Sequence, residues 1–272
     1  MRRLHESVDD GYRSPLVPGL RSTSDAQRLA EELAVASGRF ARLETNPPGL
    51  YAEVADRAVD LEERTWLAFL IAYVGPLEQA EDPFAAIASA RTSWGSGELP
   101  NLEGAQTGPR TAHDPSRGQA TLRGYRLWAE RAGSQELAFS GEPGWSPGRR
   151  FARVFERLAL PGLHRAARFE LLASLGALGL YELRADALAL GGTDDVTVAA
   201  KRAFGIGDPL LLERRAAQLA QAGQAPLEAL DLALYNWGRA EHITLGVAVE
   251  PSPEVLEATS AALGVEISLE DG

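Results

Sequence analysis

The amino-acid sequence predicts an all-α protein. Apolar residues recur at helical spacing along most of the 272-residue chain, and Gly, Pro and helix-capping residues separate the successive runs. Alternation of β-branched residues occurs near the C-terminus, at 242–251 and 264–271, where it allows a small β element. The composition, 45% apolar and 24% charged, is that of a globular protein with a buried core.

Three helical runs and a long loop account for the first part of the chain. The first run follows three consecutive cap candidates, Thr23, Ser24 and Asp25. The second run is apolar almost all round in its later part, as expected of a helix that crosses the centre of a domain. The runs cover 23–43, 51–75 and 82–91, with a break at 46–50 and a loop rich in Gly, Pro, Ser and Thr at 92–120.

The second part of the chain continues as helices joined by short breaks. A stretch rich in Gly and Pro, SGEPGWSPG at 140–148, separates the first of these helices from the rest. The runs cover 120–133, 149–159, 165–190, a segment that opens at Asp194, 208–223 and 226–241.

The length permits one large domain or two smaller ones that share a seam. We expect an arm at 1–22, which lacks the apolar region of a secretory signal, and a two-lobed helical bundle over 23–272. Its lobes are expected at about 23–120 and 121–245, followed by a tail at 246–272. The longest apolar run, from Trp66, is about half as long as a membrane span, so we expect a cytoplasmic monomer without a membrane partner.

The chain has no cysteine and four scattered histidines. The lack of cysteine excludes a disulfide framework, a thiolate-held metal cluster and a cysteine nucleophile. The histidines have no ligand spacing, so we expect no metal site built from side chains.

The net charge of −11 by itself argues against a nucleic-acid partner, but the charge is unevenly distributed. Residues 110–168 contain eleven arginines and five acidic residues, a balance of +6, so the rest of the chain carries −17. Phosphate binding needs a basic face rather than a basic protein, so 110–168 is the segment most suited to an anionic partner.

The stretch LPGLH at 160–164 joins two amphipathic runs through a very short turn. Pro161 stops the first helix and Gly162 supplies a permissive backbone. Free N–H groups at the start of the second helix favour a phosphate, although the same pattern also fits a plain helical hairpin. The candidate phosphate-binding residues are Pro161, Gly162, Leu163, His164, Arg165 and Arg168.

Two adjacent carboxylates stand at the start of the helical run in GGTDDVTVAAKRAFG, residues 191–205. Asp194 is in the position of an N-cap. Asp195 is either a second capping or solvated carboxylate, or the charged centre of a site at a helix N-terminus, where the dipole favours the ionised form.

Three stretches, LPGLHRAARFELLASLG, GGTDDVTVAAKRAFG and LEALDLALYNWGR, resemble in this order the helix-hairpin-helix DNA glycosylase superfamily, most of all its 3-methyladenine DNA glycosylase II branch. The resemblance covers about 149–239 and is weaker over 23–91. It implies a helix-hairpin-helix motif that binds double-stranded DNA, and a catalytic carboxylate at Asp195 with Asp194 as the fallback. It implies no cofactor beyond a monovalent cation at the hairpin backbone.

The sequence departs from the family pattern at three places. His164 replaces the second hairpin glycine, which lets the DNA backbone approach closely. Ala166 stands where bifunctional members carry a nucleophilic lysine, which argues against a Schiff-base lyase step. The insert at 177–190 lengthens the spacing from Gly162 to Asp195 to 33 residues and is expected to add helical turns.

A base must leave the stack before an enzyme can cut its glycosidic bond, so a wedge and a pocket are needed. Leu77 and Gln79 are the wedge candidates, because they follow the Gly-Pro turn at 75–76. Trp128, Tyr181 and Trp237 are candidates for a pocket that stacks on the base, although aromatic residues also build cores.

Three functions are consistent with the sequence. The first is a monofunctional DNA glycosylase of base excision repair that removes damaged, alkylated bases. The second is a non-catalytic helix-hairpin-helix protein that binds kinked or branched DNA. The third is a helical protein-interaction domain, which the net charge of −11 favours.

Overall fold

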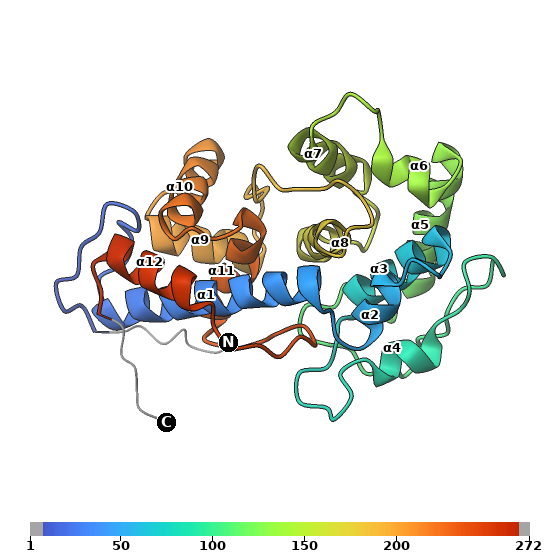
Figure 1. Cartoon of the computed structure of the whole chain (residues 1–272), viewed down its shortest axis with the longest axis horizontal. Helices are drawn as coiled ribbons and strands as arrows, with labels where there is room; N and C mark the ends of the chain where they lie inside the picture. The colour runs from blue at the N-terminus through green and yellow to red at the C-terminus, as the bar shows by residue number, and fades with distance from the viewer. Residues whose placement is uncertain (1–7, 267–272) are drawn as a thin grey trace. The chain divides into compact units, whose positions relative to one another are not determined.

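The computed structural model describes residues 8–266, which form twelve α-helices and no β-strand (Figure 1). The predicted all-α class is confirmed. The chain divides into two compact units, the first made of residues up to Ala41, Ala187–Ile243 and residues from Ala248 onward, the second of Arg42–Asp186 and Thr244–Val247. These units do not follow the predicted lobes at 23–120 and 121–245, because segments from both ends of the chain belong to the first unit.

The first unit contains helices from the beginning and the end of the sequence. Helix α11 packs against α9 and α10, and α12 packs against α10. Three of these helices begin at a side-chain cap: Asp194 caps α9, Asp208 caps α10 and Ser252 caps α12. The helices are α1 (Thr23–Thr45, of which 23–41 belong to this unit), α9 (Asp195–Phe204), α10 (Pro209–Ala222), α11 (Leu227–Arg239) and α12 (Pro253–Leu263).

Residues 8–22, the described part of the predicted arm, are anchored within the first unit. The side chains of Val17 and Leu20 are buried. The hydroxyl of Tyr12 donates to the carbonyl oxygen of Leu263 over 2.7 Å. The N–H of Gly19 donates to the carbonyl oxygen of Ala203 over 3.0 Å, which fixes the arm against the end of α9.

The second unit contains seven helices that follow one another along the chain. Helix α3 packs against α8, α2 and α6, and α7 packs against α6 and α8. Asp60 caps α3, and every residue from Thr65 to Val74 of that helix is buried. The helices are α2 (Leu50–Ala55), α3 (Leu61–Val74), α4 (Ala85–Ala90), α5 (Gly118–Ala132), α6 (Gln135–Ser140), α7 (Pro147–Arg157) and α8 (Arg165–Ala177).

Stacked aromatic rings form the core of the second unit. The rings of Phe69 and Tyr125 stack with their centroids 3.7 Å apart, and Trp66 stacks on both. Tyr125 is fully buried and donates to Gln135 Oε1 over 2.6 Å, so its polar end is satisfied inside the core. Burial raises the pKa of the Tyr125 hydroxyl well above its ordinary value, so this group stays neutral.

Several predicted elements differ from the structure. The run 51–75 is broken before α3, and the run 165–190 ends at Ala177, so the insert before Asp194 is irregular chain and adds almost no helical turn. Helices α6 and α12 were not predicted, although Ser134 and Ser252 cap them. The stretch 242–251 forms no strand, because a turn interrupts it, and most of the second stretch, 267–271, lies outside the described residues.

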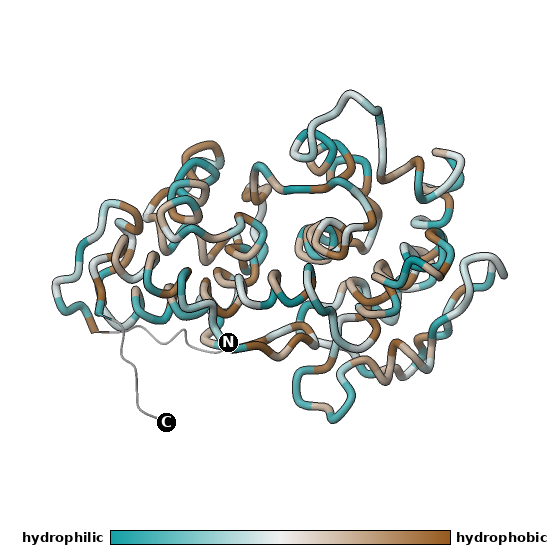
Figure 2. Tube along the Cα trace, in the orientation of Figure 1, coloured by the Kyte–Doolittle hydropathy of each residue, from teal (hydrophilic) through white to brown (hydrophobic). Residues whose placement is uncertain are grey.

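Hydrophobic residues recur along most helices between hydrophilic ones, as the brown and teal segments of Figure 2 show. This pattern places one face of each helix in a core. Within residues 8–266, no helix combines the length and the apolar character that crossing a membrane requires.

Candidate functional site

The two adjacent carboxylates at the start of α9 have different roles. Asp194 is the N-cap of α9: its side chain accepts from the N–H of Thr197 over 3.3 Å and from the Thr197 hydroxyl over 2.7 Å. Asp195 is the first residue of the helix, and 55% of its side chain is exposed. The capping role predicted for Asp194 is confirmed, and Asp195 places an exposed carboxylate at the positive end of the helix dipole.

The carboxylate of Asp195 pairs with an arginine at the end of α11. Arg239 Nη1 lies 3.2 Å from Asp195 Oδ2, and Arg239 Nη2 lies 3.1 Å from Glu241 Oε1. The hydrogen bond that Arg239 donates to Glu241, with the negative charges of Glu241 and Asp195, raises the pKa of Arg239 above its ordinary value and outweighs the opposing effect of burial. Arg239 is therefore a permanent cation shared by two carboxylates.

Gly238 explains why the end of α11 comes so close to the start of α9. A Cβ at this position would lie 2.6 Å from the Cβ of Ala199, a distance that real Cβ atoms essentially never show. Only a glycine allows the two helices to pack at this distance. The Gly-Arg pair at 238–239 thus brings the guanidinium to Asp195.

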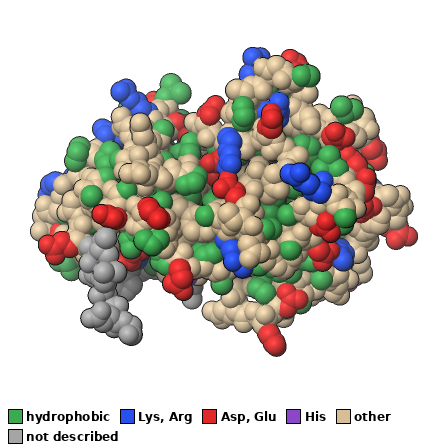
Figure 3. All heavy atoms as spheres, viewed as in Figure 1, with side chains coloured by type: hydrophobic (Ala, Val, Ile, Leu, Met, Phe, Trp, Pro, Cys, Tyr) green, Lys and Arg blue, Asp and Glu red, His purple; other side chains and the backbone are tan. Residues whose placement is uncertain are grey.

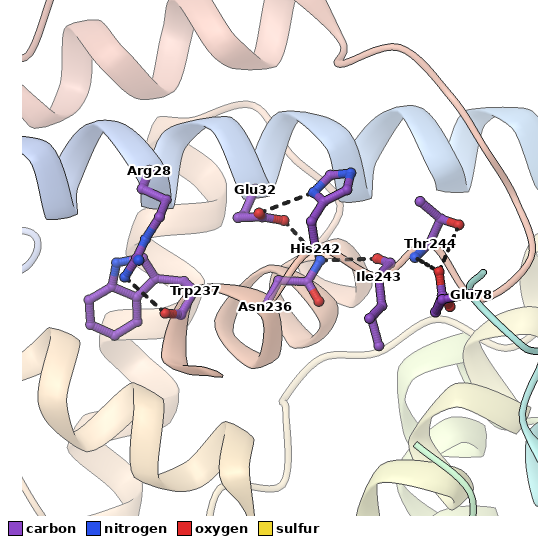
Figure 4. Close-up of polar contacts among 8 residues, drawn as sticks. All are labelled: Arg28, Glu32, Glu78, Asn236, Trp237, His242, Ile243 and Thr244. Atoms are coloured by element: carbon purple, nitrogen blue, oxygen red, sulfur yellow. Dashed lines mark hydrogen bonds and ion pairs between the residues drawn. The ribbon is translucent and has the colours of Figure 1, made fainter. Parts of the chain in front are cut away.

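A second polar group of the first unit lies between α1 and α11 and was not predicted. The buried carboxylate of Glu32 accepts from Asn236 Nδ2 over 2.8 Å, and His242 Nδ1 lies 3.2 Å from its other oxygen (Figure 4). Asn236 also donates to the carbonyl oxygen of Ile243 over 3.0 Å. The presence of an asparagine in the otherwise apolar run LALYNW, residues 232–237, is the sequence signal for such a buried partner.

Trp237 belongs to the core of the first unit. Its side chain is fully buried, and its indole N–H donates to the carbonyl oxygen of Asp25 over 2.9 Å. The guanidinium of Arg202 lies 3.9 Å from the centre of the Trp237 ring, and Arg28 donates to the carbonyl oxygen of Trp237 over 3.1 Å (Figure 4). A contact of this tryptophan with a base stays a prediction.

The predicted hairpin joins α7 to α8 in the second unit through residues 158–164. Gly162 has a φ of +82°, which an L side chain rarely adopts, and a Cβ there would collide with the hydroxyl of Thr121. That hydroxyl donates to the carbonyl oxygen of Pro161 over 2.9 Å. Leu158 and Leu163 are buried, whereas Ala159, Pro161, Gly162 and His164 are exposed.

His164 is the N-cap of α8. Its Nδ1 accepts from the N–H of Ala167 over 3.4 Å, and its Nε2 lies 2.9 Å from the carbonyl oxygen of Thr111. Because a carbonyl oxygen can only accept, Nε2 is the donor in the contact with Thr111. The side chain thus occupies one of the N–H groups that a hairpin with glycine at this position would leave for a phosphate.

The two predicted phosphate-binding arginines of α8 point into the protein. Arg165 is 8% exposed, and its guanidinium lies 5.1 Å from the centre of the Phe169 ring. Arg168 is half-buried and donates to the carbonyl oxygen of Phe155 over 3.0 Å, with its guanidinium 4.3 Å from the ring of the same residue. Burial, together with the charge of Arg165, lowers the pKa of Arg168. Both arginines pack against phenylalanine rings beside the turn, and their contact with DNA stays a prediction.

The carbonyl oxygens of the turn accept hydrogen bonds within the chain. Those of Leu158, Leu160 and His164 accept backbone N–H groups, and that of Pro161 accepts the hydroxyl of Thr121. A carbonyl oxygen has a second lone pair, so a monovalent cation at the hairpin backbone stays a prediction.

The wedge candidates lie in the loop between α3 and α4. Leu77 is half-buried and its N–H donates to the carbonyl oxygen of Pro83 over 2.9 Å, whereas Gln79 is exposed. Between them, Glu78 accepts from the N–H of Thr244 over 2.8 Å (Figure 4). It also accepts from the N–H of Leu245 over 2.8 Å. The loop is thus tied at Glu78, and Gln79 is its more accessible wedge candidate.

The remaining pocket candidates belong to the second unit. Trp128 is half-buried and packs edge-on against Phe139, and the hydroxyl of Tyr181 hydrogen-bonds to Thr65 Oγ1 over 2.7 Å. Tyr181 also lines a hollow of about 390 Å³. A separate pocket of about 300 Å³ lies at α3, lined by Glu53, Val59, Glu63, Arg64, Trp66, Leu67, Leu70, Arg91, Thr92 and Ser93.

Comparison of the chain with protein-family models, with curated proteins and with solved structures finds no match in any of the three. Among residues 8–266, no cluster of three His, Cys, Asp or Glu side chains has a geometry that could hold a metal ion.

Proposed function

We propose that the protein is a monofunctional DNA glycosylase that hydrolyses the N-glycosidic bond of a damaged, alkylated base in double-stranded DNA. The observation that carries this proposal is the division of roles at the start of α9. Asp194 satisfies the helix N-terminus, and Asp195 remains as an exposed carboxylate at the positive end of the dipole. The order of the hairpin, the Asp-Asp pair and the Trp-Gly end of α11 along the sequence supports the same assignment.

A carboxylate in this position suits the chemistry of base release. As the bond between C1′ and the base nitrogen breaks, its electron pair leaves with the base and positive charge develops on the sugar. A fixed negative charge stabilises that cation. Water then adds to C1′ and loses a proton, which Asp195 accepts and passes to solvent. An alkylated base that carried a positive charge departs as a neutral molecule.

The same arrangement gives no support to a lyase step. The position after Arg165, where a nucleophilic lysine would form a Schiff base, is Ala166. The lysine of this chain is Lys201, in α9, and its Nζ lies 3.4 Å from the carbonyl oxygen of Gly192. The proposed activity therefore ends with an abasic site and an intact DNA strand.

A second function, binding of kinked or branched DNA without catalysis, is favoured by one observation. Arg239 lies 3.2 Å from Asp195 and opposes the negative potential that a sugar cation would need. A protein that only binds distorted DNA would keep such a pair at no cost to its function.

Base release from methylated duplex DNA tests the proposal. The duplex is incubated with the wild-type protein, with Asp195→Asn or with Asp9→Asn, and the released bases are measured by mass spectrometry. Asp9→Asn is the control, because it removes one exposed carboxylate of the arm. We expect Asp195→Asn to lose at least about 10²-fold in rate and to keep its affinity for DNA, as loss of one electrostatic contact to a transition state does.

Each other result changes the conclusion. Equal release by the wild-type protein and Asp195→Asn places the site elsewhere. Binding of junction or mismatched DNA without release of any base supports the non-catalytic function. Absence of binding to every DNA at low salt, where phosphate contacts are strongest, removes both functions and favours a protein partner.

A further inference from the structure

Helix α7 carries a row of arginines on its exposed side. Arg149, Arg153 and Arg157 follow one another at intervals of four residues, so they lie on the same face of the helix. All three are exposed, whereas Gly148, Arg150, Phe151 and Val154 of the same helix are buried. The helix therefore has one face in the core of the second unit and one basic face, here called the α7 arginine row.

Trp145 orders the two ends of the α7 arginine row. Its side chain is 7% exposed, and the guanidinium groups of Arg149 and Arg157 lie 5.7 and 5.2 Å from its ring centre. Cation–π contacts of this kind hold a guanidinium while leaving its N–H groups able to donate. Within the described residues, neither of these arginines pairs with a carboxylate, so their charges are not neutralised internally.

The arginine in the middle of the α7 arginine row forms an exposed ion pair. Arg153 Nη1 lies 3.0 Å from Glu156 Oε2, and the two side chains are 51% and 63% exposed. A pair this exposed is worth little, so a phosphate can replace the carboxylate. The helix as a whole carries four arginines against one glutamate, in a chain whose net charge is −11.

We infer that the α7 arginine row binds the phosphate backbone of double-stranded DNA, an inference that rests on the proposed DNA-binding function. The row extends over two turns of helix, about 12 Å. Phosphates follow one another at about 3.4 Å along the axis for each strand, so three guanidinium groups span about three to four phosphates. Arginine is suited to this ligand because its planar group donates two parallel hydrogen bonds to phosphate.

The surroundings favour a nucleic acid over an acidic protein as the partner. Protein interfaces depend on large apolar or aromatic side chains at their centre. The exposed side chains of α7 other than its charged ones are small or capping residues, and no large exposed hydrophobic side chain of the described chain belongs to α7. Acidic and basic side chains are interspersed on the face of the molecule drawn in Figure 3, so the charge of −11 does not make that face uniformly negative.

The α7 arginine row also supplies what the hairpin lacks. Arg165 and Arg168 are held inward by Phe169 and Phe155, and the N–H of Ala167 is capped by His164. The backbone of the turn is left with few cationic groups of its own. Helix α7 leads directly into that turn, so its exposed arginines are the nearest cations along the chain.

The salt dependence of DNA binding tests the inference. Variant Arg149→Gln/Arg153→Gln/Arg157→Gln is compared with the control Arg21→Gln/Arg57→Gln/Arg214→Gln, which removes the same charge from three exposed arginines scattered along the chain. The Kd for a 20-base-pair duplex is measured at salt concentrations from 50 to 200 mM, and folding is checked by circular dichroism. Each phosphate contact contributes about 0.9 to the slope of log K against log salt, so we expect the first variant to lose about two to three units of slope.

Base release is measured on the same proteins at saturating concentration, which separates the two proposals. If the row variant binds DNA with the slope of the wild-type protein, the inference is overturned, whatever the rate of base release. If both triple variants lose the same slope, overall charge and not the α7 arginine row governs binding, which also overturns it. If the row variant alone loses slope while the wild-type protein releases no base, the DNA contact stands and the proposed catalysis fails.

Discussion

Arg239 at the end of α11 donates to Asp195 at the start of α9 across 3.2 Å, so a permanent cation holds the carboxylate assigned to catalysis. The raised pKa of Arg239 means that no ordinary assay pH removes its charge. Two positive groups therefore lie next to the carboxylate: the positive end of the helix dipole and the guanidinium. The dipole belongs to the fold, whereas the guanidinium is a side chain that a substitution can remove.

Replacement of Arg239 by glutamine is expected to accelerate base release. The positive charge at 3.2 Å weakens the field that Asp195 applies to a sugar cation, so its removal strengthens that field. Stability should change by less than about 1 kcal/mol, because the two side chains are 40% and 55% exposed. Single-turnover rates on methylated duplex DNA measure the effect. Arg239→Lys keeps the charge and is the control; a rate for Arg239→Gln no higher than that of Arg239→Lys contradicts the expectation.

Alanine at position 238 is expected to separate α9 from α11. The new Cβ would lie 2.6 Å from Ala199 Cβ, and overpacking of this kind costs about 1–3 kcal/mol. A loss of that size lowers the Tm of a chain this long by several degrees. Thermal melts of Gly238→Ala, Ala199→Gly and the double variant measure it. The double variant should be more stable than the sum of the two single changes predicts, because it lacks the clash between the two Cβ atoms. Strictly additive changes in stability would show that the two residues do not conflict.

Local sequence signals predicted the helices that build the candidate site. Asp194 and Asp208 each stand before an apolar periodic run, and each caps a helix in the structure. The same reasoning could have found α12, because Ser252 and Pro253 form a cap and first-turn pair, but the β-branched residues nearby favoured a strand. Helix α12 lies between the two stretches predicted as β, and its apolar residues Val255 and Leu263 are buried.

The direction of a charged side chain could not be predicted in the same way. Arg165 and Arg168 look like a basic face in the sequence, yet Phe169 and Phe155 draw their guanidinium groups inward. The second partner of His164 is Thr111, 53 residues earlier in the chain. Such contacts depend on tertiary packing, which a periodic pattern does not specify.

His164 is expected to stabilise α8 as its cap. Removal of a capping side chain costs about 1 kcal/mol, so His164→Ala should unfold at lower urea concentration, and His164→Ser should restore most of the loss. His164→Gly restores the hairpin pattern of the resembling family and frees the N–H of Ala167 for a phosphate. We expect this variant to bind duplex DNA more tightly than the wild-type protein. A stability of His164→Ala equal to wild type would show that the 3.4 Å contact to Ala167 contributes nothing.

Glu63 organises the loop after α4 and is expected to make its stability depend on pH. Its carboxylate accepts from Ser93 Oγ over 2.6 Å, from the N–H of Trp94 over 2.8 Å and from the N–H of Gly95 over 3.0 Å. Burial alone would raise the pKa of Glu63, but these hydrogen bonds and the charge of Arg126 outweigh it, so the pKa lies below the ordinary value of 4.5.

A carboxyl group whose pKa is lowered in the folded state makes its full contribution to stability at a pH above its pKa in the unfolded state. That contribution is lost as the pH falls from the unfolded pKa through the folded pKa. The free energy of unfolding of Glu63→Gln should therefore lie about 1 kcal/mol below that of the wild-type protein at pH 7, since the charged acceptor of three hydrogen bonds is lost. The difference should shrink as the pH falls below 4.5. Urea titrations at pH 7, 5, 4 and 3 measure it, with Glu103→Gln as the exposed control from the same loop. A difference that stays constant over this range would mean that Glu63 acts through its shape and not through its charge.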